Sequence, residues 1–196
     1  MSVEIILILA AAAVLVFWAV STYNFFVSSK ARIKAAKEEI GNQLKRQAEL
    51  IPNLESSAKG FLKQEKAIFE ALTSARKAVA KAVKSGDLQE MSDAGAQLAQ
   101  VIPQISIAVE DNPEIKSDKV VTRLMEELRD TSDKVMFSRR LLIDLVADYN
   151  VRRVSVPSRF IASMFSFEEL EGLKAPKEGE HLEVSSSDIR APKVNL

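Results

Sequence analysis

The sequence predicts an all-α protein in which an N-terminal transmembrane helix is followed by an up-and-down bundle of long helices. Three observations support this prediction. The N-terminus carries a long uncharged apolar run, apolar side chains then recur at alternating steps of four and three, and the 196 residues include only six glycines and six prolines. This spacing is typical of helices that bury one stripe of side chains against their neighbours, and few turn-forming residues suit long helices.

The first element is an apolar segment with no charged side chain between residues 5 and 29. A helix rises about 1.5 Å per residue, so roughly 20 residues cross a hydrocarbon core of about 30 Å. We therefore predict a short non-cytoplasmic N-terminus over residues 1–4 and a transmembrane anchor over residues 5–26, with Trp18 and Tyr23 near the lipid headgroups. A cleaved signal peptide is the alternative, although such peptides begin with basic residues and the only early charge here is Glu4.

Three basic residues follow the anchor closely: Lys30, Arg32 and Lys34. Because lysine and arginine beside a span favour the cytoplasmic side, we expect the helical domain, residues 27–168, to lie in the cytoplasm. These side chains also belong to the predicted membrane interface, where cations are attracted to anionic lipid. The alternative is that they only keep the start of a helix in water.

The longest apolar stripe runs from Ile33 to Ala82 and contains Pro52. A proline removes one helical hydrogen bond, but the rhythm of the stripe does not change across it. We therefore predict one helix that bends at Pro52, with a break at the proline as the alternative. Glu65 lies on the stripe, and a buried carboxylate would need a partner. The candidate partners are Arg46, Arg76, Arg139 and Arg140.

A second stripe follows the turn signal Ser85-Gly86-Asp87 and runs from Leu88 to Val109. Glycine takes left-handed backbone angles at little cost, so it suits the end of one helix, and the polar residues beside it suit caps. Pro103 lies inside this segment, and we expect it to kink or end the helix.

A third stripe runs from Val121 to Arg152, after a predicted cap at Ser117 or Asp118, and Pro157 closes this helix. Thr131 and Ser138 are polar positions on this stripe. They either specify the register of the helices or allow close helix approach while bonding their own backbone.

The C-terminal part divides into two segments. Residues 159–167 are short, aromatic and apolar, and either fold back over one end of the bundle or contact a membrane surface or a partner. Residues 169–196 contain Gly, Pro, Ser and mixed charges with little to bury, so we predict a disordered tail.

Several of these residues form a pattern that resembles the LemA family of bacterial membrane proteins. The most specific piece is Leu50-Ile51-Pro52-Asn53-Leu54. The other matching positions are spread along the chain in the family's order: Lys45, Arg46, Gly60, Glu65, Arg76, Pro113, Arg139, Arg140, Tyr149, Asn150 and Pro157. The sequence departs from the family pattern where Asn112 replaces an aromatic residue and Gln47 replaces a second arginine.

The resemblance implies a single-pass protein of the bacterial inner membrane with a four-helix bundle and no established enzymatic activity. The resemblance implies no catalytic residue, because the shared motifs are interpreted as structural. Some members of the family are linked with membrane organisation or envelope stress.

Residues that could carry chemistry are scarce. The chain has no cysteine, and its single histidine, His181, lies in the tail. This set cannot build the common zinc sites or a nucleophile–base pair, so we expect no enzyme activity, cofactor or metal site. Basic side chains are too few and too mixed with acids for a nucleic-acid surface, and no small-molecule substrate is indicated.

The leading hypothesis is a non-enzymatic scaffold that contacts the lipid bilayer through its anchor and recruits protein partners or assembles with itself. The alternative hypothesis is a sensor that binds a ligand inside the bundle, around Glu65, Thr131 and Ser138.

Overall fold

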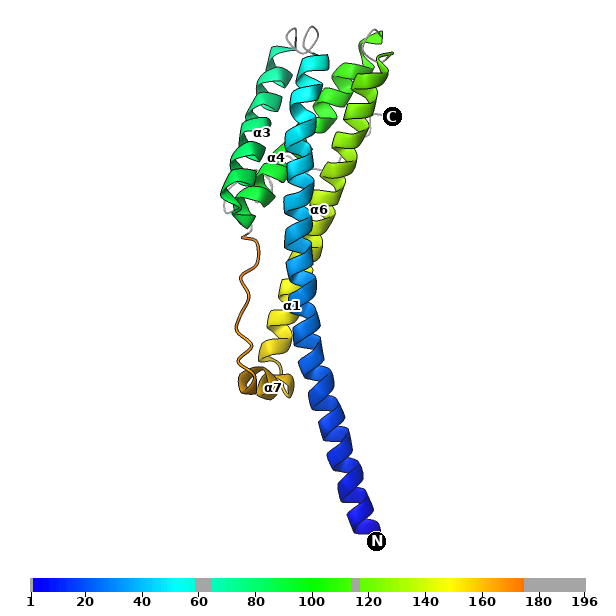
Figure 1. The fold of residues 1–196 in the computed structure, drawn as a ribbon, viewed down its shortest axis with the longest axis vertical. Helices are drawn as coiled ribbons and strands as arrows, with labels where there is room; N and C mark the ends of the chain where they lie inside the picture. Colours follow the sequence, from blue (N-terminus) through cyan, green and yellow to red (C-terminus); the bar gives the residue numbers. More distant parts are fainter. Residues whose placement is uncertain (1, 59–64, 114–116, 175–196) are drawn as a thin grey trace, which may run out of the picture.

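The computed structural model describes residues 2–58, 65–113 and 117–174, and within these ranges the chain is helical and contains no strand. The helices are shown in Figure 1. Their bounds are Val3–Ser57 for α1, Lys66–Ser85 for α3, Leu88–Glu110 for α4, Lys119–Val154 for α6 and Ser158–Met164 for α7.

The long helix α1 has two parts with opposite surroundings. Its apolar side chains from Val3 to Phe17 are exposed, whereas from Thr22 onwards a side chain is buried every three or four residues as far as Leu54. The first part is long and apolar enough to span a membrane. The coarse prediction of an all-helical chain with one apolar N-terminal helix is therefore confirmed.

Pro52 lies inside α1, which runs unbroken from Val3 to Ser57. The prediction that the helix continues through this proline is confirmed. The hydroxyl of Ser56, one turn after the proline, donates a hydrogen bond of 2.8 Å to the Pro52 carbonyl oxygen. In α4, Pro103 also lies inside a helix that continues to Glu110, so Pro103 does not end it.

The prediction of a single helix from Ile33 to Ala82 is wrong. α1 ends at Ser57, and Lys66 begins a separate helix, α3, which packs against both α1 and α4. The apolar rhythm persists because both helices bury their stripes in the same core, including Ile51 and Leu54 on α1 and Leu72 and Val79 on α3. A seven-residue repeat of apolar positions indicates which face of a helix is buried, but it does not indicate whether the chain continues as one helix or reverses into a second one.

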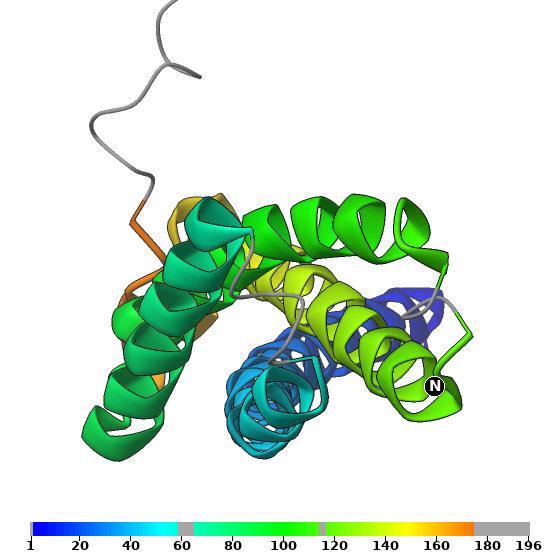
Figure 2. The ribbon, with the colours of Figure 1, turned by 90° about the horizontal axis from the view of Figure 1, so that it is seen from above.

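The helices pack most extensively as two pairs, α1 with α6 and α3 with α4. α4 also contacts α6 and α1, and seen from above it lies obliquely to its neighbours (Figure 2). Because α3 and α4 are much shorter than α1 and α6, they cover one end of the long pair (Figure 1). The other end of this pair is met by α7, which contacts both long helices.

Turn and cap chemistry fixes the reversals between helices. Gly86 ends α3 with a φ of 70°, and the Asp87 carboxylate caps α4 by accepting from the Glu90 backbone N–H at 2.8 Å. The Glu90 carboxylate accepts from the Lys81 ammonium at 2.6 Å, and this hydrogen bond lowers the pKa of Glu90. Asp118 caps α6 through the N–H groups of the next turn, which confirms one of the two predicted caps.

The end of the described chain differs from the predicted disordered tail. Residues 165–174, which we call the C-terminal strap, leave α7 and run along the helices (Figure 1). Leu170 and Leu173 pack against the core, and Leu170 and Lys174 make backbone hydrogen bonds to side chains of α6 and α4. The predicted boundary at residue 169 is therefore wrong for residues 169–174, and residues 175–196 lie outside the described ranges.

Close helix packing at Gly95 generates a stability prediction. A Cβ on Gly95 of α4 would stand 2.6 Å from Cγ1 of Val135, a β-branched side chain that is fully buried in α6. We expect Gly95→Ala to lower the free energy of unfolding by about 1–3 kcal/mol, because a stiff neighbour must move. Thermal unfolding of the full chain in detergent measures this.

Gly41→Ala is the matched control on α1. Its Cβ would meet the flexible end of Met91 at 3.7 Å, which is an ordinary contact. Alanine is a better helix former than glycine by up to about 1 kcal/mol, so this variant should be at least as stable as the parent. Equal effects of the two substitutions would contradict the close approach at Gly95.

Candidate functional site

The C-terminal strap closes over an aromatic cluster between α1 and α6. The Phe26 ring stacks on Phe167 with centroids 4.8 Å apart and meets Tyr149 edge-on at 5.4 Å. Phe26 and Tyr149 are fully buried. Lys30, one turn further along α1, lies over the Phe167 ring at 5.4 Å. The cluster therefore joins the start of the helical domain, the end of α6 and the strap.

Two neighbouring polar side chains of α6 hold the backbone of the strap. The Tyr149 hydroxyl donates to the Glu168 carbonyl oxygen at 3.0 Å. The Asn150 side chain donates to the Leu170 carbonyl oxygen at 2.8 Å and accepts from the Leu170 N–H at 3.0 Å, so it pairs with one residue as a neighbouring strand would. Burial raises the pKa of the Tyr149 phenol, which keeps this donor protonated.

Gln89 repeats the Asn150 arrangement at the far end of the strap. Its side-chain amide accepts from the Lys174 N–H at 2.9 Å and donates to the Lys174 carbonyl oxygen at 3.3 Å. Arg153 of α6 forms an ion pair of 2.7 Å with Glu169, the residue before Leu170 on the strap. Tyr149 and Asn150 are among the predicted motif residues, but no motif or pattern in the sequence indicates that Gln89 binds the same segment.

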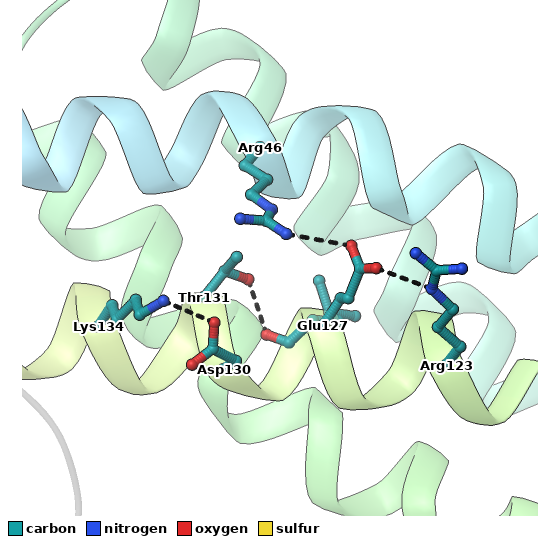
Figure 3. A network of polar contacts seen from close by, with 7 residues as sticks. Arg46, Arg123, Glu127, Asp130, Thr131 and Lys134 are labelled. Atoms are coloured by element: carbon teal, nitrogen blue, oxygen red, sulfur yellow. Dashed lines mark hydrogen bonds and ion pairs between the residues drawn. The ribbon is translucent and has the colours of Figure 1, made fainter.

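A second polar site links α1 and α6 near the opposite end of the domain (Figure 3). Arg46 on α1 points at Glu127 on α6, with 3.3 Å between its guanidinium nitrogen and the carboxylate, and Arg123 approaches the same carboxylate at 3.2 Å from one turn earlier. Hydrogen bonds from Arg46 and then Arg123 lower the pKa of Glu127. Lys134 and Asp130, also drawn in Figure 3, form a separate pair at 2.7 Å.

The predicted buried ion pair of Glu65 is wrong. Glu65 is exposed at the start of α3, and no ion pair to it is found among the described residues. Arg76 instead pairs at 3.4 Å with Glu55 of α1, whose side chain is 14% exposed. The half-buried carboxylate that ties α3 to α1 is therefore Glu55, which lies off the apolar stripe and was missed for that reason.

The three residues proposed for a sensor site do not come together. Glu65 borders an open groove with residues near the end of α4, whereas Thr131 and Ser138 are buried positions of α6 that do not border it. The Thr131 hydroxyl donates to the Leu128 carbonyl oxygen at 2.9 Å, which is the self-bonding role expected of a small residue at a close contact.

The remaining motif residues fall into three groups. Leu50, Ile51 and Leu54 are buried, Pro52, Arg139 and Asn150 are half-buried, and Lys45, Asn53, Arg140, Pro113 and Pro157 are exposed. Gly60 lies outside the described residues. The most specific motif, residues 50–54, therefore faces the core through Leu50, Ile51 and Leu54.

The residues predicted at the membrane interface differ in their exposure. Trp18 is half-buried, Tyr23 packs its ring against Phe165, and Lys30, Arg32 and Lys34 are exposed.

Within the described ranges, no group of three or more histidine, cysteine or acidic side chains could hold a metal ion. The polar side chains that are buried there are hydroxyls and one amide. These are groups that pack and hydrogen-bond without changing charge near neutral pH. The sites described above can therefore join helices and hold a peptide segment.

The fold and these sites define an all-helical protein with one apolar N-terminal helix and a packed helical domain. The model of the LemA family matches residues 36–186, which is most of the chain, and the chain belongs to the LemA family. The matched region begins beyond the apolar part of α1 and includes α3, α4, α6 and α7. No curated protein matches the chain.

Asn150→Ala tests how the strap is held. Losing both hydrogen bonds to Leu170 should weaken the attachment of the strap by about 1–3 kcal/mol and speed hydrogen exchange at the Leu170 amide accordingly. Hydrogen–deuterium exchange of the full chain measures it. The control is Asn53→Ala, an exposed motif asparagine of α1, which should leave that amide unchanged. Unchanged exchange in Asn150→Ala contradicts the pairing.

Glu127→Gln tests the link between α1 and α6. Because the folded pKa of Glu127 lies below its unfolded value, its contribution is fully present above the unfolded pKa and is lost as pH falls through the folded pKa. The variant should therefore melt below the parent at neutral pH, and the difference should shrink as the pH falls through the folded pKa of Glu127. Thermal unfolding at neutral pH and over a series of acid pH values measures it.

Glu126→Gln is the matched control for Glu127→Gln. Glu126 is the exposed neighbour of Glu127, and no ion pair to it is found among the described residues. It should show the parental dependence of melting temperature on pH. A deficit in Glu127→Gln that persists unchanged into acid contradicts the charge link.

Proposed function

We propose that this protein is a non-enzymatic, membrane-anchored scaffold of the bacterial inner membrane that recruits protein partners or further copies of itself. The observation that carries the proposal is the continuity of α1, which passes from an exposed apolar part into the core of the helical domain without a break. Helices bend sharply at proline, at glycine or where a group inserts into the backbone ladder. The first glycine or proline of the chain is Gly41, so the junction contains neither residue.

Such a junction suits a scaffold because the anchor and the domain cannot easily tilt apart. From residue 27 to Ser57 the helix extends about 45 Å, so it would hold the far end of the domain well away from the lipid surface. A partner bound along the helices would be kept at a fixed height and orientation. The cytoplasmic side is favoured by Lys30, Arg32 and Lys34, which follow the apolar part and are exposed.

We further propose that α1, α3, α4 and α6 form an up-and-down four-helix bundle. The pairing of α1 with α6 and of α3 with α4 supports this arrangement, as do the caps and the glycine turn that reverse the chain between α3 and α4. In this arrangement the long α1–α6 pair extends past the shorter pair and offers its sides to other proteins.

A groove between α1 and α6 is the surface we favour for recruitment. Ala35 and Ala36 line it from α1, and Phe137, Leu141 and Leu145 line it from α6. Arg32, Glu39 and Lys134 supply charges around the apolar side chains. The Phe137 ring is exposed. An apolar groove between two helices with charged surroundings suits an amphipathic helix, either from a partner or from a second copy.

Site-specific photo-crosslinking in intact cells tests the recruitment proposal. A photoreactive phenylalanine replaces Phe137, and the control replaces Val120, an exposed apolar residue at the start of α6. We expect adducts at position 137 and few at position 120. An adduct of twice the chain mass indicates self-assembly, and other masses indicate partners. No adduct at position 137, together with a monomer in detergent, contradicts the scaffold.

A further inference from the structure

Exposed apolar side chains gather where α6 meets α7. Val154 and Val156 lie at the end of α6 and in the following link, and Phe160, Met164 and Phe165 lie on or just after α7. We call these five residues the basal patch. The opposite face of α7 is buried through Ser158, Ile161 and Ala162. α7 is therefore an amphipathic helix whose inner face is occupied and whose outer face is bare.

The patch lies at a defined height on the anchor helix. Trp18, Thr22 and Phe25 of α1 line an open groove together with residues at the end of α6 and in the link to α7, among them Arg152, Ser155 and Pro157. The Tyr23 ring also meets Phe165 edge-on, with centroids 4.8 Å apart. The patch thus stands beside residues 18–25 of α1, where the exposed apolar part of that helix gives way to its buried stripe.

Height and direction together identify what would cover the patch. An anchor that starts near residue 5 leaves the hydrocarbon about 20 residues later, which is the level of Trp18 to Phe25. α7 lies across the direction of α1 (Figure 1), so with α1 upright in a bilayer it would lie along the lipid surface. Interfacial helices place apolar side chains among the upper acyl chains and basic ones among the headgroups.

Basic side chains at the base fit that position. Arg152 lies over the Phe25 ring at 4.2 Å beside the groove. Arg159 is exposed on α7, and no ion pair to its side chain is found in the part of the chain that the structure describes. Arginines next to exposed aromatic and aliphatic groups can reach phosphate groups while their neighbours enter the apolar layer.

We propose that the basal patch is a membrane seat, which inserts into the headgroup–acyl boundary of the glycerophospholipid layer that holds the anchor. The inference rests on the proposed anchoring and goes beyond it, because the domain then contacts the bilayer at two places, the anchor and α7. Two contacts fix the tilt of the domain and prevent its rotation away from the surface. The aromatic cluster of Phe26, Tyr149 and Phe167 connects the seat to the packed helices.

Lipid is favoured over a second protein copy by position. Phe165 of the basal patch meets Tyr23 of α1, so a protein that covered the patch would occupy the level at which the span places the lipid surface. The exposed fractions of these side chains, 64% and 72%, resemble the 64% of Leu15 in the apolar part of α1. The Ile107 side chain, near the end of α4, has a similar exposure of 61% without lying beside the anchor.

The chain contains no cysteine, so single-cysteine variants of the full protein can each be labelled at one position. The variants Phe160→Cys and Met164→Cys are labelled with a nitroxide and reconstituted in vesicles of phosphatidylcholine and phosphatidylglycerol. Leu15→Cys, labelled in the same way, is the reference for lipid, and Ile107→Cys is the reference for water. Collisions with lipid-soluble oxygen and with a water-soluble nickel chelate are measured. Circular dichroism confirms that each variant keeps the parental helix content.

We expect the oxygen-to-nickel collision ratio at positions 160 and 164 to exceed that at position 107 several-fold and to stay below that at position 15, which lies deeper in the bilayer. Ratios at 160 and 164 equal to that at 107, with position 15 in lipid, overturn the seat and leave the anchor intact. A water-like ratio at position 15 as well overturns both. Labels at 160 and 164 that are shielded from both reagents indicate a protein contact, which also overturns the seat.

Discussion

The packing of α1 against α6 is the contact on which the rest of the structure depends. The stripe that α1 buries begins at Thr22, directly after its exposed apolar part, so one helix is both the candidate span and a wall of the core. α3 and α4 complete the core at one end of this pair, and α7 with the strap completes it at the other. Each addition covers apolar surface that the long pair leaves open.

The polar contacts of the domain join elements that packing brings together. Arg46 and Glu127 connect α1 to α6, Arg76 and Glu55 connect α3 to α1, and the amides of Asn150 and Gln89 hold the strap. The charged pairs are partly exposed, so they add less to stability than to alignment. The side-chain amides of Asn150 and Gln89 supply hydrogen-bond partners to backbone N–H and C=O groups of the extended strap, which has no neighbouring strand among the described residues to supply them.

Apolar periodicity predicted the helices well because each of them buries one face. The stripes on α1, α4 and α6 matched buried positions, and Gly86, Asp87 and Asp118 marked turns and caps through local backbone chemistry. Periodicity failed where two helices share one core in one phase, and it therefore joined α3 to α1. It also misplaced Glu65, since a position on the stripe near a helix end can remain in water.

The sequence by itself determined the helical class, the apolar N-terminal helix and the LemA motifs, because these follow from local spacing and composition. Only the tertiary structure decided where α1 ends, which acids pair with Arg46 and Arg76, and that the strap is held by Asn150 and Gln89. It also decided that the corner between α6 and α7 stands beside the end of the apolar part of α1. These are contacts between residues far apart in the chain, and they form only when the long helices have packed.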